Sequence, residues 1–113
     1  MTATYVLQKD EKGQFSFILR THSGQVLLTS AVYADKEIAM RRISAARQLA
    51  HNARNYEILA AQDGLPYFVV KNAKKEVIAQ SEMYPDSESL RNGINLVKGK
   101  TRGAQLEDLT GTS

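Results

Sequence analysis

Two stretches of the chain align without a gap at an offset of 51 residues: GQFSFILRTHSGQVLLTSAVY at 13–33 and GLPYFVVKNAKKEVIAQSEMY at 64–84. The alignment extends over 5–47 and 56–98 and holds nine identities in 43 positions. Because the matches preserve the same alternation of side chains and the same glycine turn, they indicate an internal duplication.

Each copy predicts three short strands followed by a helix. After the glycine turn, apolar side chains alternate with other side chains in the manner of a half-buried strand. Further on, Ala39, Ile43 and Ala46 recur at helical spacing. Asp35 and Asp86 stand where a helix N-cap would accept free N–H groups. The repeating unit is therefore βββα.

These units predict one α+β domain over 1–113, because a single meander with one helix buries too little surface to be stable alone. Repeat 1 covers 5–50 and repeat 2 covers 56–98. We expect them to share one antiparallel sheet with two helices packed on it, related by a pseudo-two-fold axis. Residues 99–113 are predicted to form a loose tail, with a last short strand near 105–110.

Composition bounds the class of protein. The 113 residues are 42% hydrophobic and 24% charged, as in ordinary globular proteins. The absence of cysteine excludes disulfides, thiolate nucleophiles, Fe–S clusters and cysteine-containing zinc sites. No apolar run approaches the length of a membrane span, and the N-terminus does not read as a signal peptide. We expect a cytoplasmic protein without membrane association.

The two quoted stretches, each followed by a helix, resemble the tandem repeats of the YegP-like family of small bacterial proteins. The second copy carries the motif residues Ser81, Tyr84, Gly93, Ile94, Val97 and Lys98. The first carries Ser30, Tyr33, Ile43 and Arg47, with Arg42 in place of the glycine and Ala46 in place of the valine. The resemblance implies two β3-α units sharing one antiparallel sheet, with terminal strands exchanged between units. It implies no reaction, because the family is uncharacterised.

The Ser and Tyr residues of the motif have two interpretations. A hydroxyl and a phenol near a helix N-terminus could bind an anion or support acid–base chemistry. We favour structural roles: Ser30 and Ser81 bond to the backbone of a turn, and Tyr33 and Tyr84 close the core. Gly93 predicts a close approach of the second helix to the sheet.

Charge and apolar residues suggest two candidate surfaces. The formal net charge is +3, and Arg41, Arg42, Arg47 and Arg54 could form a basic helix face for a nucleic-acid backbone, although such charges often only solvate a helix. A protein partner could bind the outer face of the sheet, where alternation places Ile18, Leu27, Tyr67, Val69 and Ile78. Strand propensity alone is the competing explanation for that face.

No motif assigns an activity. The sequence lacks a G-x-S-x-G, Walker A or G-x-G-x-x-G pattern, and neither histidine has a partner at metal-ligand spacing. We therefore expect no catalytic residue, cofactor or metal. The favoured hypothesis is a non-enzymatic binding or structural module of unknown role. A basic nucleic-acid-binding module is the alternative, and a small enzyme or anion-binding protein is third.

Overall fold

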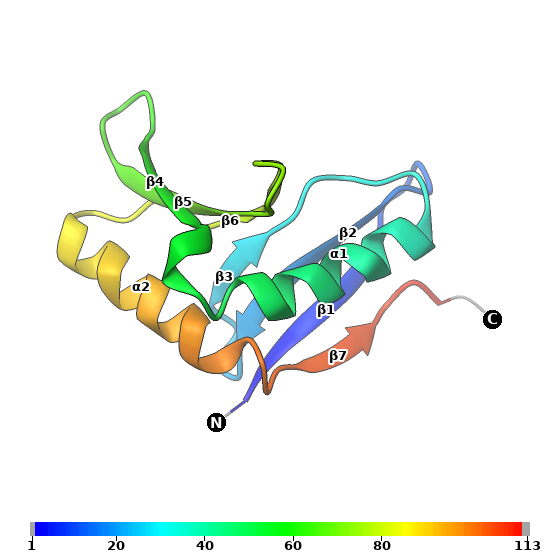
Figure 1. Ribbon diagram of the computed structural model, residues 1–113. Coiled ribbons are helices and arrows are strands. Elements are labelled where there is room, and N and C mark those ends of the chain that lie inside the picture. Colours follow the sequence, from blue (N-terminus) through cyan, green and yellow to red (C-terminus); the bar gives the residue numbers. More distant parts are fainter. Residues whose placement is uncertain (1, 112–113) are drawn as a thin grey trace.

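The computed structural model describes residues 2–111 and contains one seven-stranded sheet with two helices (Figure 1). The expected domain also includes Met1, Thr112 and Ser113, which lie outside the described residues. The elements in chain order are β1 (Ala3–Lys9), β2 (Phe15–Thr21), β3 (Val26–Thr29), α1 (Lys36–Leu49), the 3-10 turn η1 (Ala53–Asn55), β4 (Tyr56–Ala60), β5 (Pro66–Lys71), β6 (Val77–Gln80), α2 (Ser87–Lys100) and β7 (Gln105–Asp108). Their order across the sheet is β4-β5-β6-β3-β2-β1-β7.

Glycine turns open both hairpins, as the sequence predicts. Gly13 has φ +81° and Gly64 has φ +86°, in the left-handed region that residues with a Cβ rarely adopt. In the β1–β2 turn the Gly13 N–H donates to the Asp10 carbonyl, and in the β4–β5 turn Gly64 N–H donates to the Ala61 carbonyl. The two hairpins therefore form by the same local chemistry.

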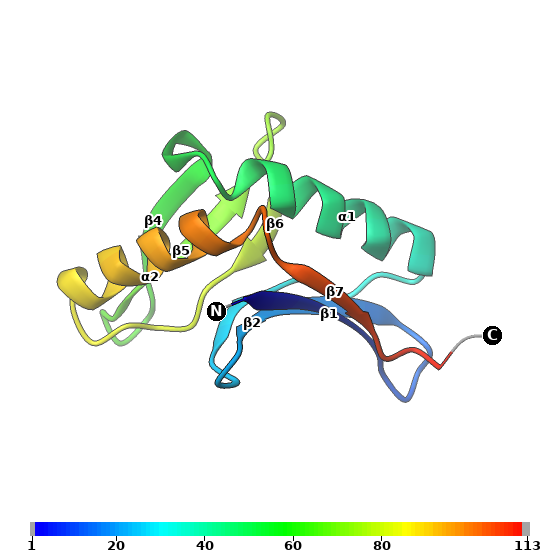
Figure 2. The ribbon, with the colours of Figure 1, turned by 90° about the horizontal axis from the view of Figure 1, so that it is seen from below.

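The helices begin where the N-cap pattern predicts. Asp35 accepts a hydrogen bond from the Glu37 N–H at 2.8 Å, and Asp86 accepts one from the Ser89 N–H at 2.8 Å. Helix α1 packs against β1, β2, β5 and β6, so it contacts strands from both halves of the chain. Both helices lie on the inner side of the bent sheet (Figure 2).

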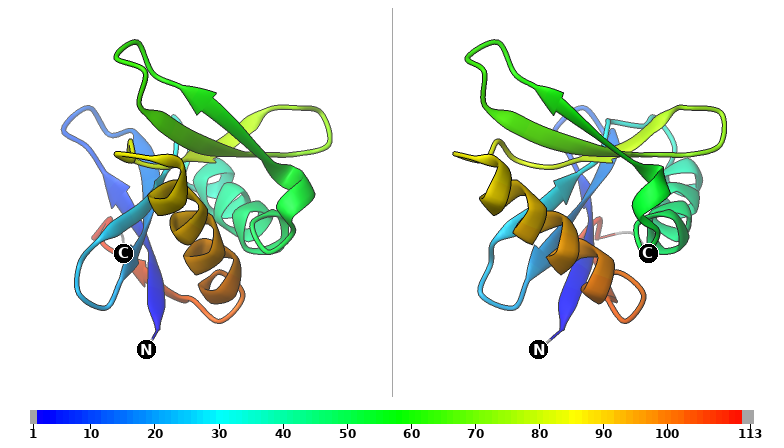
Figure 3. Two further views of the ribbon diagram at one scale, coloured as in Figure 1. Left: turned by 90° about the vertical axis from the view of Figure 1, so that its left-hand side faces the viewer. Right: turned by 60° about the vertical axis from the view of Figure 1, so that its left-hand side comes forward.

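The sheet bends where its two halves meet. Strands β3 and β6 are joined through the pair Thr29 and Gln80, and the strands on either side cross steeply in Figure 3. The bend wraps the sheet around the helices, and one core cluster contains Phe17, Phe68 and Ile43. The two halves thus share a single hydrophobic core.

The sheet is mixed, so the expectation of a wholly antiparallel sheet is wrong. Strand β7 pairs in parallel with β1, with Thr4 opposite Gln105 and Leu7 opposite Asp108. Only four residues separate α2 from β7, so the chain re-enters the sheet beside the start of β1 and runs in the same direction. Residues 99–111 do not form a loose tail, because Thr101 is fully buried. The short strand predicted near 105–110 is present as β7.

Two residues assigned to the outer sheet face lie in the core instead. Leu27 and Ile78 are fully buried members of the core cluster. The register of β2 with β3 shifts between Leu19 and Arg20, and that of β5 with β6 shifts between Val70 and Lys71. Each shift leaves one residue of the facing strand without its own partner, which is a β-bulge. Strict alternation therefore fails at these two positions.

Candidate anion-binding groove

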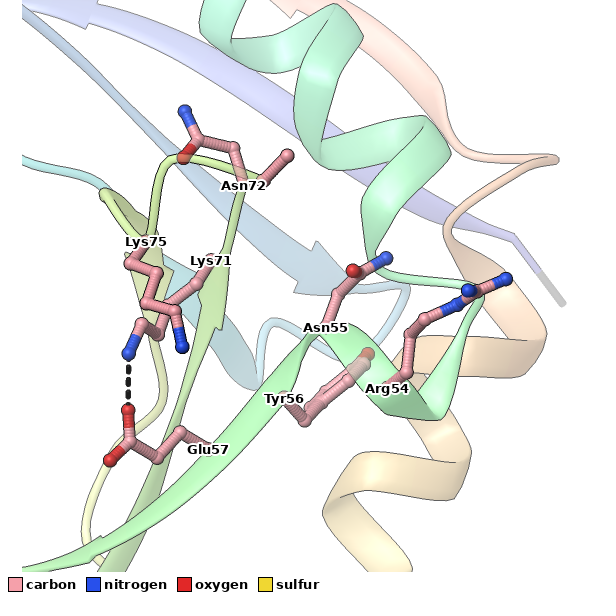
Figure 4. Close-up of a pocket in the computed structure, with 8 residues that line it drawn as sticks. Arg54, Asn55, Tyr56, Glu57, Lys71, Asn72 and Lys75 are labelled. Carbon is pink, nitrogen blue, oxygen red and sulfur yellow. Dashed lines mark hydrogen bonds and ion pairs between the residues drawn. The ribbon is translucent and has the colours of Figure 1, made fainter.

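A polar groove of about 340 Å³ lies at the start of β4, against the end of β5 and the turn that follows it (Figure 4). Two segments that are distant in the sequence, residues 54–57 and residues 71–75, supply its walls. Its lining residues are Arg54, Asn55, Tyr56, Glu57, Lys71, Asn72, Ala73 and Lys75. Among them are three cationic side chains and one carboxylate.

Asparagine side chains hold both walls of the groove. On the first wall, Asn52 caps η1 by accepting from the Arg54 N–H at 3.1 Å, and the Asn55 amide donates to the Leu49 carbonyl at 2.9 Å. On the second wall, Asn72 Oδ1 accepts from the N–H groups of Lys74 and Glu76. These bonds fix the backbone from which the cationic side chains extend.

Lys75 adopts a backbone conformation that is unusual for a residue with a Cβ. Its φ is +67°, at the turn where the aligned first copy has Gly24 with φ +96°. Such a conformation costs roughly 1–2 kcal/mol for an L residue. The turn therefore places a cationic side chain beside the groove, at a backbone conformation that glycine would adopt without strain.

The charge of the groove is positive. Lys71 Nζ lies 2.5 Å from Glu57 Oε1, and this hydrogen bond and charge hold the pKa of the Glu57 carboxyl below its usual range, with a smaller contribution from Lys75. Within residues 2–111, the side chains of Arg54 and Lys75 make no ion pair with a carboxylate. An anion entering the groove therefore meets three cationic side chains against one carboxylate.

Tyr56 lines the groove and supplies no ionised group. Its hydroxyl donates to the Ala50 carbonyl at 2.5 Å, and burial raises the pKa of the phenol above its usual value. Its ring packs on Phe68, with centroids 5.3 Å apart. Tyr56 therefore anchors β4 to the end of α1 in its neutral form.

The four arginines predicted to form one basic face are spread apart. At about 100° per helical residue, Arg42 lies about 100° from Arg41, and Arg47 lies about 120° from it in the other direction. Arg41 is exposed and pairs with Glu37 at 3.5 Å. Arg54 lies beyond α1 and lines the groove. No single face of α1 carries all of these charges.

The other two arginines turn toward the protein. Arg42 lies 3.6 Å from a Glu76 carboxylate oxygen and over the ring of Tyr33. Arg47 donates to the Ala104 carbonyl at 2.5 Å and lies over the ring of Tyr5. Both guanidinium groups are therefore engaged in holding neighbouring elements together.

The motif serines bond to the backbone. The Ser30 hydroxyl accepts from the Phe17 N–H at 2.8 Å and donates to the Ala31 carbonyl at 2.7 Å. The Ser81 hydroxyl accepts from the Phe68 N–H at 3.0 Å and donates to the carbonyl of the next residue. Each serine therefore provides the acceptor for the backbone N–H of a core phenylalanine, Phe17 in β2 and Phe68 in β5.

The motif tyrosines have different neighbours. The Tyr84 ring stacks on Phe68 and lies against Gly93, where an added Cβ would come within 2.2 Å of the Tyr84 hydroxyl. The close approach at Gly93 is thus made to the Tyr84 side chain and not to a strand. Arg42 takes the place of this glycine in the first copy, and its guanidinium covers the Tyr33 ring.

Three residues of the expected outer patch remain on that face. In the sheet ladder, Val69 stands opposite Glu57 and Gln80 and is nearly fully buried. Ile18 and Tyr67 are half-buried. With Leu27 and Ile78 in the core, these residues do not form the predicted exposed patch.

Sequence reasoning missed most of the groove. Of the three cationic side chains that line the groove, only Arg54 was among the predicted binding residues. The fold of η1 beside the β5–β6 turn depends on contacts between segments that are distant in the sequence. The asparagines at 52, 55 and 72 were the available signal, since Asn commonly fixes turns through its side chain.

The described part of the chain shows no metal centre and no membrane helix. No group of three or more His, Cys, Asp or Glu side chains within residues 2–111 is arranged to hold a metal ion. Neither α1 nor α2 is long and apolar enough to cross a bilayer. The fold and the groove define a small α+β protein with one mixed sheet, two helices and a cation-lined surface hollow.

Relatives of this class identify its family. Residues 61–108 match the family model described as Domain of unknown function (DUF1508). A UPF0339 protein of Acinetobacter baylyi is 33% identical over 98% of this chain and 100% of its own length. YegP of Escherichia coli K12 is 32% identical over 97% of this chain and 100% of its own length. The chain belongs to the YegP family of UPF0339 proteins, as its motifs predict.

Two solved structures share the fold. The solution NMR structure of a UPF0339 protein from Shewanella oneidensis has a TM-score of 0.90 at 33% identity, covering 97% of this chain and 93% of that one. The solution NMR structure of the Escherichia coli protein yegP, a protein of unknown function, has a TM-score of 0.91 at 32% identity, covering 100% of this chain and 97% of that one. The α+β architecture is therefore that of the family.

Proposed function

We propose that this protein is a non-catalytic binding module and that the groove at the start of β4 receives an anionic group. The observation that carries the proposal is the charge of the groove, where Arg54 and Lys75 lack a carboxylate partner among residues 2–111. The Asn-capped turns hold both cations on fixed backbone, which reduces the entropy lost on binding.

The chemistry of the groove supports binding without catalysis. A general base works best with a pKa near the operating pH. The pKa of the Glu57 carboxyl is lowered by Lys71, and that of the Tyr56 phenol is raised by burial, so both are displaced away from neutrality. The hydroxyls of Ser30 and Ser81 are committed to backbone bonds.

We also propose that the fold is a fused duplicate with a pseudo-two-fold axis between β3 and β6. The pairing of Thr29 with Gln80 supports this, because these residues are 51 positions apart and a two-fold axis brings equivalent residues together. The placement of β7 on β1 supports exchange of a terminal strand between the units. Superposition of 5–47 on 56–98 in an experimental structure tests the axis, and a different strand path in the two segments would refute it.

A cytoplasmic location belongs to the same proposal. The chain has no cysteine, so an oxidising compartment would not stabilise it through disulfides. Fractionation of the native cell tests it, with recovery in the cytosolic fraction as the expected result.

An NMR titration with tripolyphosphate tests the groove. We expect amide shifts concentrated at residues 54–57 and 71–75, with affinity that falls as salt rises. Arg54→Ala and Lys75→Ala should each weaken binding about three- to ten-fold, on the scale of one charge-assisted contact. Arg41→Ala is the matched control and should change nothing. Shifts centred on α1, or equal losses with the control, would refute the groove.

A further inference from the structure

The aligned strands β1 and β4 differ in whether another strand covers their outer side. The edge of β1 is occupied by β7, whereas β4 stands at the other end of the sheet with one neighbour, β5 (Figure 1). An uncovered edge presents unpaired N–H and C=O groups that can pair with another extended segment. The edge of β4 is therefore a place where a strand could be added.

The ladder shows which backbone groups face outward. Ala61 N–H donates to the Leu65 carbonyl, and bonded pairs alternate with non-bonded pairs along an antiparallel ladder. By this alternation the backbone groups of Tyr56, Ile58 and Ala60 point away from β5. On the other edge, the carbonyl of Leu7, which aligns with Ile58, accepts from the Leu109 N–H.

Ile58 also lacks the cover that its aligned residue has. Ile58 is paired with Phe68, and Leu7 is paired with Phe17, so both side chains are on the inner face of the sheet. Leu7 is completely buried, but 59% of Ile58 is exposed. An added strand would bury part of this apolar surface.

Strand β7 shows what kind of segment a sheet edge of this protein accepts. Its Glu107 lies 3.0 Å from Arg20, and its Asp108 lies 2.7 Å from Lys36. It runs parallel to β1. Lys71 aligns with Arg20, and Arg54 and Lys75 line the same groove at the start of β4.

We propose that the edge of β4 binds an acidic, extended segment of another polypeptide as an added strand parallel to β4. The inference rests on the proposed function and names the ligand of the groove. The incoming carboxylates lie at the Arg54 and Lys75 end, because Glu57 repels an acidic residue placed beside it. An apolar residue of the segment covers Ile58, and backbone bonds to residues 56, 58 and 60 provide affinity for any such sequence.

The probe is the octapeptide Ala-Gln-Leu-Glu-Asp-Leu-Thr-Gly, which reproduces residues 104–111 of this chain. Binding is followed by NMR on the full chain, together with amide hydrogen exchange. We expect slower exchange at Ile58 and Ala60, because an added strand supplies their missing hydrogen-bond acceptors. A peptide with Gln and Asn in place of its Glu and Asp should bind at least ten-fold more weakly.

Substitutions at Lys75 and Ile58 separate the contribution of charge from that of the apolar contact. Lys75→Glu should weaken binding of the acidic peptide about ten-fold. The same substitution should improve binding of a peptide that carries Lys at both acidic positions. Ile58→Asp should abolish peptide binding, while Val32→Asp, at a comparably exposed apolar residue beyond β3, should leave it unchanged. If Ile58→Asp folds poorly, the Lys75→Glu variant with the Lys-substituted peptide still tests the proposal.

The outcomes distinguish this inference from the proposed function. If the peptide shifts the amide signals of Arg54 and Lys75 but does not slow hydrogen exchange in β4, the groove binds anions and strand addition is refuted. If a short RNA binds the groove and the peptide does not, the ligand class is wrong. If the β4 amides change with protein concentration alone, the occupant is a second copy of the chain, and the inference is refuted.

Discussion

At Gly93, the neighbouring Tyr84 side chain decides whether a residue with a Cβ can be accommodated. In the helix alone, alanine would be favoured over glycine by about 1 kcal/mol. In the fold, a Cβ at this position would lie 2.2 Å from the Tyr84 hydroxyl and 2.5 Å from its Cζ. The ring cannot retreat easily, because it stacks on Phe68 and the Tyr84 N–H is bonded to the Pro66 carbonyl.

We predict that Gly93→Ala lowers the free energy of unfolding by about 1–3 kcal/mol, the usual cost of overpacking. Gly99→Ala is the matched control in the same helix, since nothing lies within 4 Å of a Cβ there. It should stabilise the protein by up to about 1 kcal/mol. Urea denaturation measures both. Equal stabilisation by the two substitutions would show that the Tyr84 contact is unimportant.

A second residue-scale prediction concerns the motif serines. Ser81→Ala leaves the Phe68 N–H without its acceptor, and an unsatisfied buried donor costs about 1–3 kcal/mol. Ser30→Ala should cost less, because Ser30 is only half-buried. Ser44→Ala, on the exposed side of α1, serves as the control in the same denaturation experiment. A loss at Ser81 no larger than at Ser44 would contradict the structural role.

At the scale of elements, the bulges and the short last strand set the shape of the sheet. The bulges place Leu27 and Ile78 in the core and accompany a stronger local twist. Strand β7 is held to α1 by the Asp108–Lys36 ion pair and to β2 by the Glu107–Arg20 ion pair. The attachment of β7 therefore depends on charge as well as on the ladder with β1.

This attachment predicts a pH dependence. Bonds from Lys36 and Thr110 lower the pKa of the Asp108 carboxyl well below its usual range. A carboxyl whose folded pKa is depressed stabilises the fold above its unfolded pKa, near 3.9, and loses that contribution as pH falls below it. Amide exchange of β7 should therefore accelerate below about pH 4 relative to β2. Asp108→Asn should weaken this response, and Glu11→Gln, in an exposed turn, should not.

At the scale of the whole molecule, a buried polar cluster ties the chain ends to the helices. The Tyr5 hydroxyl and Thr101 Oγ1 are 2.6 Å apart, and Thr101 Oγ1 also donates to the Ala46 carbonyl at 3.4 Å. Arg47 reaches past Tyr5 to the Ala104 carbonyl. Strand β1, both helices and the approach to β7 therefore meet at one point.

We predict that Tyr5→Phe and Thr101→Val each destabilise the protein by about 1–2 kcal/mol, because each leaves a buried hydroxyl partner unsatisfied or removes its bond. The double variant should cost less than the two single losses added together, since both partners are then gone. Thermal and urea denaturation provide the four free energies of the cycle. Strict additivity would show that the hydroxyls do not act as a pair.

The local elements of this protein follow from its sequence because their determinants are local. Gly13 and Gly64 set the turns, Asp35 and Asp86 begin the helices, and the alternating strands follow the turns. The family was also predictable, since the motif residues recur at fixed spacing. The turns and the helix starts depend only on residues close to them in the sequence.

The tertiary structure alone decided the features that join distant segments. Whether Leu27 faced inward depended on a register shift against β2, and the parallel course of β7 depended on where α2 ended. The groove likewise forms only because η1 folds beside the β5–β6 turn, which places Arg54 and Lys75 in the lining of one hollow. The turns, caps and helices follow from the sequence because residues next to one another in the chain set them. Strand register, the edge left open at β4 and the groove depend on long-range pairing, and only the folded chain settles them.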